Sequence, residues 1–421
     1  MTDITTPTRR STLLWCAVAL ARAGGPTGAL QSPASLQVVR RSTAAITPDQ
    51  AKWLDEAYKN LREAQSGENL AAHQAIHEHD CVGKPEQNVH DSIRFLYWHR
   101  AFLMYHQEQL FKSVPADKRE FVVLPYWEWS KTKSLSFPCA YSDPDRYPNL
   151  FRERRPRAGQ GDLSRQAYFD IANRDLRDAW GLSHFEQSNV IELLFRPTLE
   201  SAHNFMHDAV GENFGLKTSP LDPLFYCFHA EIDRVWMSWA ARAGVDSSMS
   251  KESVDKLKVA VFGKSSKPLY WYGDAGNLDY KYDAPYSANA PNDAFELVSA
   301  DAPTPQGMEK PGIRLKRQRF FFVPKGRHII RIRLGPRALP IGTYDLLFKG
   351  RSGGEFRGGP VLALSEGKKD SEYIISSRDA LRGLDDRYFT ASLKNRAAEG
   401  SPEIELLPSE VQIYRVHRRH R

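Results

Sequence analysis

The pattern of hydrophobic and polar positions divides the chain into a helical part and a later strand-rich part. The pair Thr47-Pro48 is a typical helix start, and the apolar residues that follow recur at helical spacing. No Gly or Pro interrupts a dense apolar pattern over residues 92–112, and similar stretches occur within 191–207 and 223–242. Mostly helical structure is therefore expected from about residue 36 to residue 241.

A different pattern follows residue 312. Apolar and polar residues alternate there between Gly and Pro positions, as in the segment RQRFFFVPKGRHIIRIRLGP. Alternation with a period of two predicts half-buried strands, so residues 313–421 are expected to form a small β-sandwich or barrel. Residues 283–312 are rich in Pro, Ala, Asn and Asp and are interpreted as a linker.

The length agrees with this division, because single hydrophobic cores rarely grow beyond about 250–300 residues and this chain has 421. Residues 31–282 are expected to form the larger, helical domain. The formal net charge is +7, but much of the excess comes from terminal arginines such as those in RVHRRHR. The basic residues form no stripe, so a nucleic-acid partner is not expected.

The first thirty residues have the features of an export signal. Arg9 and Arg10 precede the short apolar stretch LLWCAVALA, which small residues follow. Paired arginines before such a stretch are typical of a twin-arginine signal, which predicts a periplasmic or secreted protein of bacterial type. A plain apolar N-terminus is the alternative. No later apolar run approaches the roughly 20 residues needed to cross a bilayer, so stable membrane insertion is not expected.

Histidines carry the strongest chemical signal. The chain has thirteen, and ten of them lie between His73 and His229. His203 and His207 are four residues apart, so both imidazoles emerge from one face of a helix, and His229 lies in the next predicted helix. Three imidazoles from each half of the helical part would make two metal sites that face each other.

The ligand types that are missing from this pattern limit which metal ion it can bind. A di-iron bundle would need glutamate ligands, and a zinc hydrolase would usually show HExxH or a mixture of ligand types. Coordination by imidazoles alone suits copper, which stands at the top of the affinity order for divalent metals. The four cysteines are too few and too scattered for a disulfide framework.

Three segments carry a resemblance to a known family. VHDSIRFLYWHR, HNFMHDAVG and DPLFYCFHAEIDRVW resemble the copper-binding signatures of type-3 copper proteins, namely tyrosinases, catechol oxidases and hemocyanins. The resemblance covers about residues 36–282 and implies a mainly α, four-helix-bundle catalytic core that holds two copper ions. It also implies oxidation of o-diphenols, and o-hydroxylation of monophenols, to o-quinones with O2. Reversible O2 binding of the hemocyanin kind is the alternative.

The resemblance also implies the copper ligands. His90 and His99 match the second and third ligands of the first copper site, and the second site takes three further residues: His203, His207 and His229. His77 is chosen as the first ligand because it lies four residues before Cys81, with His79 as the reserve. In several family members that cysteine forms a thioether with the second ligand, which here would join Cys81 to His90. An inert buried thiol is the alternative.

Further site residues follow from the same resemblance. Glu200 and Asn204 match positions that hold a water molecule proposed as the base for monophenols; the alternatives are a helix-surface acid and a residue that orients an imidazole. Leu216 is expected over the first copper site, unless a loop shift brings Phe214 there. Asp208 is expected to place a negative charge at a partly solvated site mouth and to favour neutral or cationic phenols.

Other family marks occur in the expected order. They include Arg40 or Arg41, the segment LPYWEWS, the pair Asp233-Arg234, and the tyrosines of NLDYKYD. Gln107 stands where the family usually carries a glutamate, and Glu108 is expected to take its place. The segment TYDLLFKGRSGGEFRGGPVLAL resembles the β-rich domain that covers the active site of latent plant polyphenol oxidases; a purely stabilising domain is the alternative. The oligomeric state and the natural phenol do not follow from the sequence.

Overall fold

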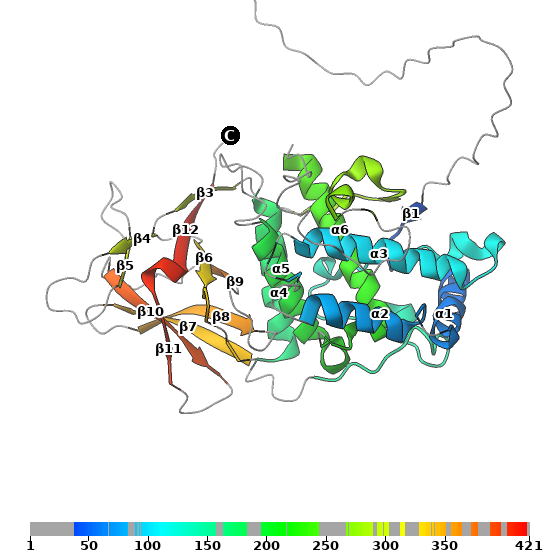
Figure 1. The fold of residues 1–421 in the computed structure, drawn as a ribbon, viewed down its shortest axis with the longest axis horizontal. Coiled ribbons are helices and arrows are strands. Elements are labelled where there is room, and N and C mark those ends of the chain that lie inside the picture. Colours follow the sequence, from blue (N-terminus) through cyan, green and yellow to red (C-terminus); the bar gives the residue numbers. More distant parts are fainter. Residues whose placement is uncertain are drawn as a thin grey trace, which may run out of the picture. The chain divides into compact units, whose positions relative to one another are not determined.

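The computed structural model is described over most of the chain after residue 37. The described residues are 38–65, 67–82, 89–90, 92, 94–156, 163–182, 195–215, 217–243, 267, 269–288, 293–297, 299–302, 312–315, 328–337, 339–340, 342–350, 355–363, 372–377, 388–396 and 402–418. The predicted export signal and Leu216 lie outside these ranges. Figure 1 follows the described elements from the blue and green helices to the orange and red strands.

The first half of the chain is helical, as its pattern predicts. Its α-helices are α1 (Pro48–Glu63), α2 (Leu70–His77), α3 (Arg94–Lys112), α4 (Arg165–Gly181), α5 (Arg196–Val210) and α6 (Pro223–Ala243). Helix α1 begins at the predicted place, because the Thr47 hydroxyl accepts from the Gln50 amide and the Gln50 side chain accepts from the Thr47 amide. A π-helical turn, Glu78–Val82, continues α2.

Buried polar contacts hold the helical part together. Helix α3 contacts α1, α5 and α6, and α4 packs against α5. Strands β1 (Val38–Arg40) and β2 (Tyr280–Tyr282) pair in parallel, with Arg40 buried against the Tyr280 ring at 3.7 Å. Of the two arginines considered, Arg40 is therefore the buried one.

The prediction that Glu108 replaces Gln107 is wrong. Gln107 is itself buried, donating to the Val122 carbonyl at 3.0 Å and accepting from the Leu124 amide at 2.7 Å. Glu108 pairs instead with Lys112 and is half exposed. An uncharged amide suits this position because it meets one donor and one acceptor of the backbone.

The second half forms two antiparallel sheets. One sheet has the order β4-β5-β10-β7-β8 with β11 on β10, and the other has the order β3-β12-β6-β9. The strands are β3 (Asp293–Leu297), β4 (Ser299–Ala302), β5 (Gly312–Leu315), β6 (His328–Arg333), β7 (Gly342–Gly350), β8 (Glu355–Ala363), β9 (Glu372–Ser377), β10 (Tyr388–Asn395), β11 (Ile404–Leu406) and β12 (Val411–Arg418).

Both sheets contribute to one hydrophobic core. Ile330 and Ile413 come from one sheet, while Leu346 and Phe389 come from the other. Of the two architectures expected, a sandwich is therefore the one observed in the described strands.

Two strands lie inside the segment interpreted as a linker. Strand β3 pairs with β12, and β4 pairs with β5. The interpretation of residues 283–312 as a linker is therefore corrected for these strands. The composition of this segment indicates local flexibility only, whereas the strands form through pairing, in the case of β3 with a partner far along the chain.

The strand-rich half contacts the helices. Tyr168 of α4 hydrogen-bonds Thr343 of β7 at 3.0 Å, and Ser201 of α5 donates to the Ile374 carbonyl of β9 at 3.3 Å. Within the described ranges, no helix has both the length and the apolar character required to span a bilayer.

Candidate metal centre

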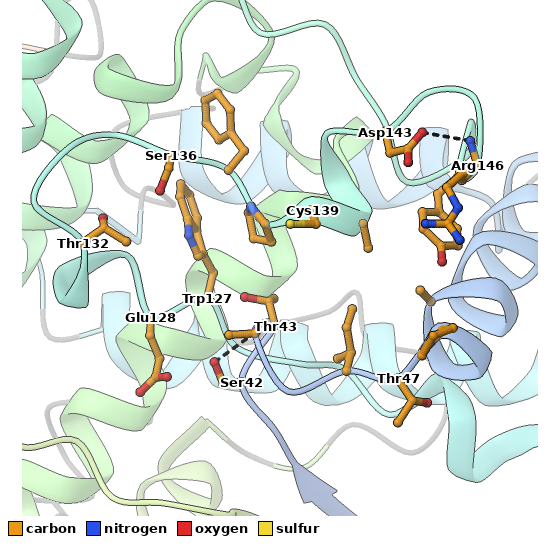
Figure 2. Close-up of a pocket in the computed structure, with 18 residues that line it drawn as sticks. Ser42, Thr43, Thr47, Trp127, Glu128, Thr132, Ser136, Cys139, Asp143 and Arg146 are labelled. Carbon is orange, nitrogen blue, oxygen red and sulfur yellow. Dashed lines mark hydrogen bonds between the residues drawn. The ribbon is translucent and has the colours of Figure 1, made fainter.

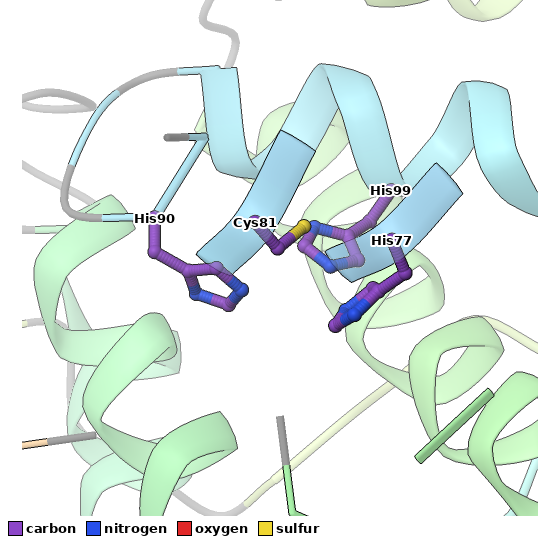
Figure 3. A group of neighbouring side chains, drawn as sticks. All are labelled: His77, Cys81, His90 and His99. Carbon is purple, nitrogen blue, oxygen red and sulfur yellow. The ribbon is translucent and has the colours of Figure 1, made fainter. Parts of the chain in front are cut away.

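Six buried histidines converge from four helices and one loop. The first triad consists of His77 at the end of α2, His90 in the following loop and His99 on α3. Nitrogen atoms of these rings and the Cys81 sulfur all lie within 4.8 Å of one another. Figure 3 shows the three rings around one space, with Cys81 beside them.

The second triad comes from α5 and α6. His203 and His207 are one helical turn apart, and His229 faces them from α6. The Nε2 atom of His203 lies 2.9 Å from that of His207 and 3.0 Å from that of His229. These three ring nitrogens therefore point at one place.

The two triads face each other. The rings of His99 and His229 stack with centroids 4.6 Å apart, and those of His90 and His203 lie 5.3 Å apart. Ligand nitrogens of His99, His203 and His229 also fall within 4.8 Å of one another. Two ions held by the triads would be close neighbours.

Hydrogen bonds to Nδ1 orient most of these rings. Backbone carbonyls of Phe95, Phe214 and Phe225 lie 2.6–2.9 Å from the Nδ1 atoms of His99, His207 and His229 respectively. A carbonyl only accepts, so Nδ1 carries the proton and Nε2 presents a lone pair. The sequence contains part of this signal, because Phe95 and Phe225 each lie four residues before the histidine that they orient.

Side chains orient two further rings. His90 Nδ1 lies 3.0 Å from Glu200 Oε1, and His203 Nδ1 lies 2.8 Å from Asn204 Oδ1. Such outer contacts fix the tautomer of a metal-binding imidazole and raise its basicity.

Burial favours the neutral form of three of these rings. Burial, with the neighbouring imidazoles, holds the pKa values of His99, His203 and His229 well below their usual range. Neutral imidazoles are the form that binds a metal ion.

The donor set fits a metal ion. In the tautomers that the Nδ1 contacts select for His207 and His229, Nε2 is an acceptor, and each faces the acceptor Nε2 of His203. Acceptors about 3 Å apart repel unless they share a cation. In addition, His99 Nε2 is buried with no hydrogen-bond partner among the described residues. All-nitrogen coordination without carboxylates suits copper.

His79, the reserve for the first ligand, lies outside the triad. Its side chain is 59% exposed, and its Nδ1 lies 2.7 Å from Asp80 Oδ1. Asp80 also accepts from Trp98 Nε1 at 2.7 Å, and the Trp98 ring packs against His77 and His99. Nothing in the local sequence marks Asp80 and Trp98, although they support the first triad.

Glu200 and Asn204 both contact imidazoles of the two triads. Glu200 is 2% exposed, so the alternative of a helix-surface acid is wrong. Its second oxygen accepts from Arg196 Nη1 at 2.8 Å, a contact that the spacing of four residues permits but does not by itself indicate. The contact of Asn204 with His203 matches the orienting role left open for it.

Asp208 does not lie at an open mouth, because it is buried and 2% exposed. The corresponding prediction of a partly solvated charge is corrected. One residue along a helix turns the side chain by about 100°, so Asp208 leaves α5 in a different direction from His207. Phe214 lies against the second triad, 5.2 Å from the His207 ring, and Leu216 lies outside the described residues.

Two cavities near the helices are lined by none of the histidines of the two triads. One cavity of about 390 Å³ is lined by residues that include Ser42, Trp127, Cys139 and Arg146 (Figure 2), and by none of the six histidines. A space of only about 20 Å³ lies between Glu200 and Asn204 on one side and Leu362 and Tyr373 on the other. Strands β8 and β9 therefore cover this side of α5.

Comparisons with known proteins agree with the histidine pattern. Residues 65–161 and 165–242 match the family model described as the common central domain of tyrosinase. A tyrosinase of Streptomyces lincolnensis is 28% identical over 234 residues, which are 48% of this chain and 83% of that protein. Hemocyanin units G and H of Sepia officinalis are 25% identical over 261 residues, covering 54% of this chain and 43% of theirs.

A solved structure extends the likeness in fold to most of the chain. A latent aurone synthase, a polyphenol oxidase, superposes with a TM-score of 0.58 at 14% identity, covering 92% of this chain and 90% of its own. At this identity the match concerns the fold alone. It includes the helical part and reaches into the strand-rich part.

Proposed function

Because this chain belongs to the type-3 copper protein family, whose cofactor is a pair of copper ions, we propose that it oxidises o-diphenols to o-quinones with O2. The observation that carries the proposal is the pair of facing triads. In this assignment His77, His90 and His99 hold one ion, while the second triad holds the other. Helices α2, α3, α5 and α6 then form the four-helix bundle around the ions.

The chain's own side chains hold the copper ions and keep the imidazole rings in a fixed orientation. The copper pair, when bound, supplies one-electron exchange at each ion and a site for O2. Anchored Nδ1 atoms hold the rings in place, so the ligand set needs little rearrangement during turnover. Phe214, Phe225 and Phe228 pack around the second triad and keep water from it.

Hydroxylation of monophenols needs an additional base, since a phenol with a pKa near 10 must lose its proton first. Glu200 and Asn204 are the candidates for holding a water molecule that acts as this base. Both oxygens of Glu200 and the amide oxygen of Asn204 already accept hydrogen bonds. Each of these oxygens has a second lone pair that can accept from such a water molecule.

Reversible O2 binding is the second candidate function. The space of about 20 Å³ beside Glu200 and Asn204 is close to that of one water molecule, too small for a phenol ring. A protein that only carried O2 would need no larger opening. The hemocyanin relatives support the same alternative.

Oxygen uptake separates the two functions. The copper-loaded chain is mixed with catechol, tyramine or tyrosine in air, and both O2 consumption and quinone absorbance are recorded. Continuous uptake with catechol supports the oxidase; saturating, reversible uptake without quinone supports the carrier. The assay is repeated after limited proteolysis near residues 303–311, where faster oxidation would indicate that the strand-rich half is a lid.

Two further proposals concern covalent processing. Cys81 and His90 are proposed to form a thioether, in which loss of one S–H and one C–H hydrogen delivers two electrons to O2; an intact mass two hydrogens lower tests it. The first thirty residues are proposed to direct export by the twin-arginine route. Fusion of these residues to a reporter, with Arg9 and Arg10 changed to Lys in a control, tests the second proposal.

A further inference from the structure

A second pair of buried histidines lies next to the first triad. His73 precedes His77 by one turn of α2, and His106 follows His99 by seven residues, two turns of α3. Residues at these spacings share a helix face, so each histidine continues the row that supplies a triad member. Both side chains are completely buried.

The distance between the ring centroids of His73 and His106 falls within the range found between imidazoles of the same triad. The centroids of His73 and His106 lie 5.1 Å apart, and the rings are nearly perpendicular. Within the triads, corresponding centroids lie from 4.4 Å, for His203 and His207, to 6.4 Å, for His77 and His90. The spacing of the two rings is therefore compatible with one ion bound between them.

One nitrogen of each ring has a partner and the other has none. His73 Nδ1 lies 2.9 Å from the Asn69 carbonyl oxygen, and His106 Nε2 lies 2.8 Å from the Tyr58 hydroxyl. His73 Nε2 and His106 Nδ1 are buried without a hydrogen-bond partner in the described part of the chain. Buried polar atoms are rarely left unpaired, and an ion at this place would account for both.

The surroundings favour a monovalent ion. His106 stacks on the Tyr226 ring with centroids 3.3 Å apart, and the His73 ring lies 4.9 Å from that of Tyr105 and 5.9 Å from that of Phe102. No carboxylate is hydrogen-bonded to either histidine in the described residues, so a divalent ion would lack compensating charge. Burial lowers the pKa of His73 to about 4, which leaves its ring neutral.

We propose that His73 and His106 bind a third copper ion, as Cu(I), through His73 Nε2 and His106 Nδ1. His106 then donates its Nε2 proton to the Tyr58 hydroxyl oxygen, which selects the tautomer that frees Nδ1. Neutral imidazoles suit copper in its monovalent state as well as its divalent state. The choice of copper rests on the proposed function, but the site itself does not require catalysis.

A cavity offers the ion a way in. Tyr105, whose ring contacts His73, also lines a cavity of about 310 Å³ together with Met104 and Glu108. The thioether of Met104 is a soft group of the kind that binds Cu(I). A shift of the half-buried Tyr105 ring would join this cavity to the histidine pair.

The number of bound copper ions tests the proposal. The metal-free full chain is titrated anaerobically with Cu(I) in competition with a chromophoric Cu(I) chelator. Three ions per chain are expected, with two remaining in His73→Gln and in His106→Phe, which preserves an aromatic ring against Tyr226. His79→Gln removes an exposed histidine outside all three sites and should keep three.

Two results would overturn the proposal. Binding of only two ions by the unmodified chain does so whatever the variants do, and so does a third ion that survives in both variants. Circular dichroism melting shows whether each variant is folded. Failure of the proposed function is seen separately, as copper binding without turnover of catechol.

Discussion

In a histidine ring, the hydrogen bond made by one nitrogen determines whether the other nitrogen can bind a metal ion. His90 illustrates this, because its Nδ1 meets the carboxylate of Glu200, which Arg196 holds in turn. Neither partner touches the space between the triads through this contact. Their effect on the metal therefore passes through the orientation of His90.

Replacement of Glu200 should weaken copper binding. Glu200→Ala removes the acceptor for His90 Nδ1, and loss of such an outer contact typically lowers metal affinity by about 10–100-fold. Glu200→Gln keeps one carbonyl acceptor and should lose less. Copper titration of both variants checks this, and equal affinities for the two would contradict the orienting role.

The pH dependence of stability depends on the buried histidines. Burial lowers the pKa of His73 to about 4, against about 6.5 in the unfolded chain. Only the unfolded state gains this proton between these values, so stability is full above pH 6.5 and falls as the pH is lowered toward 4. From pH 7 to pH 5 His73 alone should lower the free energy of unfolding by about 2 kcal/mol.

Urea unfolding of the metal-free chain at pH 7 and pH 5 measures this effect. His73→Phe should reduce the difference between the two pH values, whatever its effect on stability at pH 7. An unchanged difference would mean that His73 does not stay neutral in the folded state.

A buried ionic network joins several elements of the helical part. Asp233 of α6 accepts from Arg100 of α3 at 2.5 Å and from the hydroxyls of Tyr280 and Tyr282, each at 2.6 Å. Arg40 of β1 lies 3.8 Å from the same carboxylate. Burial alone would raise the pKa of Asp233, but the two arginines lower it.

Asp233→Asn should therefore destabilise the protein by about 3 kcal/mol, because it leaves Arg100 and Arg40 buried without a full counter-charge. Tyr282→Phe, which removes one neutral donor, should cost about 1 kcal/mol. Chemical denaturation compares the two. A loss for Asp233→Asn no greater than that for Tyr282→Phe would show that the charge is not needed.

Helix α5 ends at a glycine that affects the second triad. Gly211 has φ of 112°, and a side chain there would collide with the Arg155 carbonyl. The turn that follows brings the Phe214 carbonyl to His207. Only glycine meets both requirements.

Gly211→Ala should lower the free energy of unfolding by at least about 2 kcal/mol and weaken copper binding by the second triad. Gly67→Ala is the matched control, since Gly67 also has positive φ but open space around it. Thermal melting and copper titration measure the two effects. Equal losses in both variants would show that the collision at Gly211 is relieved.

The two halves of the molecule meet beside the second triad. Leu362 of β8 and Tyr373 of β9 face Glu200 and Asn204 across a space too small for a phenol. The strand-rich half therefore restricts access to α5 in the observed arrangement. An oxidase whose phenol enters on this side needs this contact to open, whereas an O2 carrier does not.

Tyr373→Ala should accelerate catechol oxidation by widening this space. A gain of about tenfold in kcat/KM corresponds to about 1.4 kcal/mol less cost of opening. Leu407→Ala, which alters a side chain that is 54% exposed, is the control and should change nothing. Identical rates for the two variants would place the route of substrate elsewhere.

Local signals in the sequence predicted much of this fold. The start of α1 follows from Thr47 and Pro48, whose cap depends on neighbouring residues alone. The spacing of His203 and His207 placed both rings on one face of α5 for the same reason. Alternation predicted the strands of the sandwich, because the period of two is a property of each strand.

Contacts between distant residues could not be predicted in this way. Strand β3 resembled a linker because its partner, β12, lies far along the chain. Gln107 is held by hydrogen bonds to the backbone of Val122 and Leu124, which lie more than ten residues away in the sequence. Asp208 is buried by tertiary packing, which its place in the sequence does not indicate.

The sequence by itself determined the helices, the strand-rich half and the set of histidines from which metal ligands are drawn, since spacing and periodicity are local. Only the tertiary structure decided that His79 stays outside, that Glu200 and Asn204 orient rings, and that His73 meets His106. Those contacts join elements that separate stretches of chain bring together, and their geometry arises from packing in three dimensions.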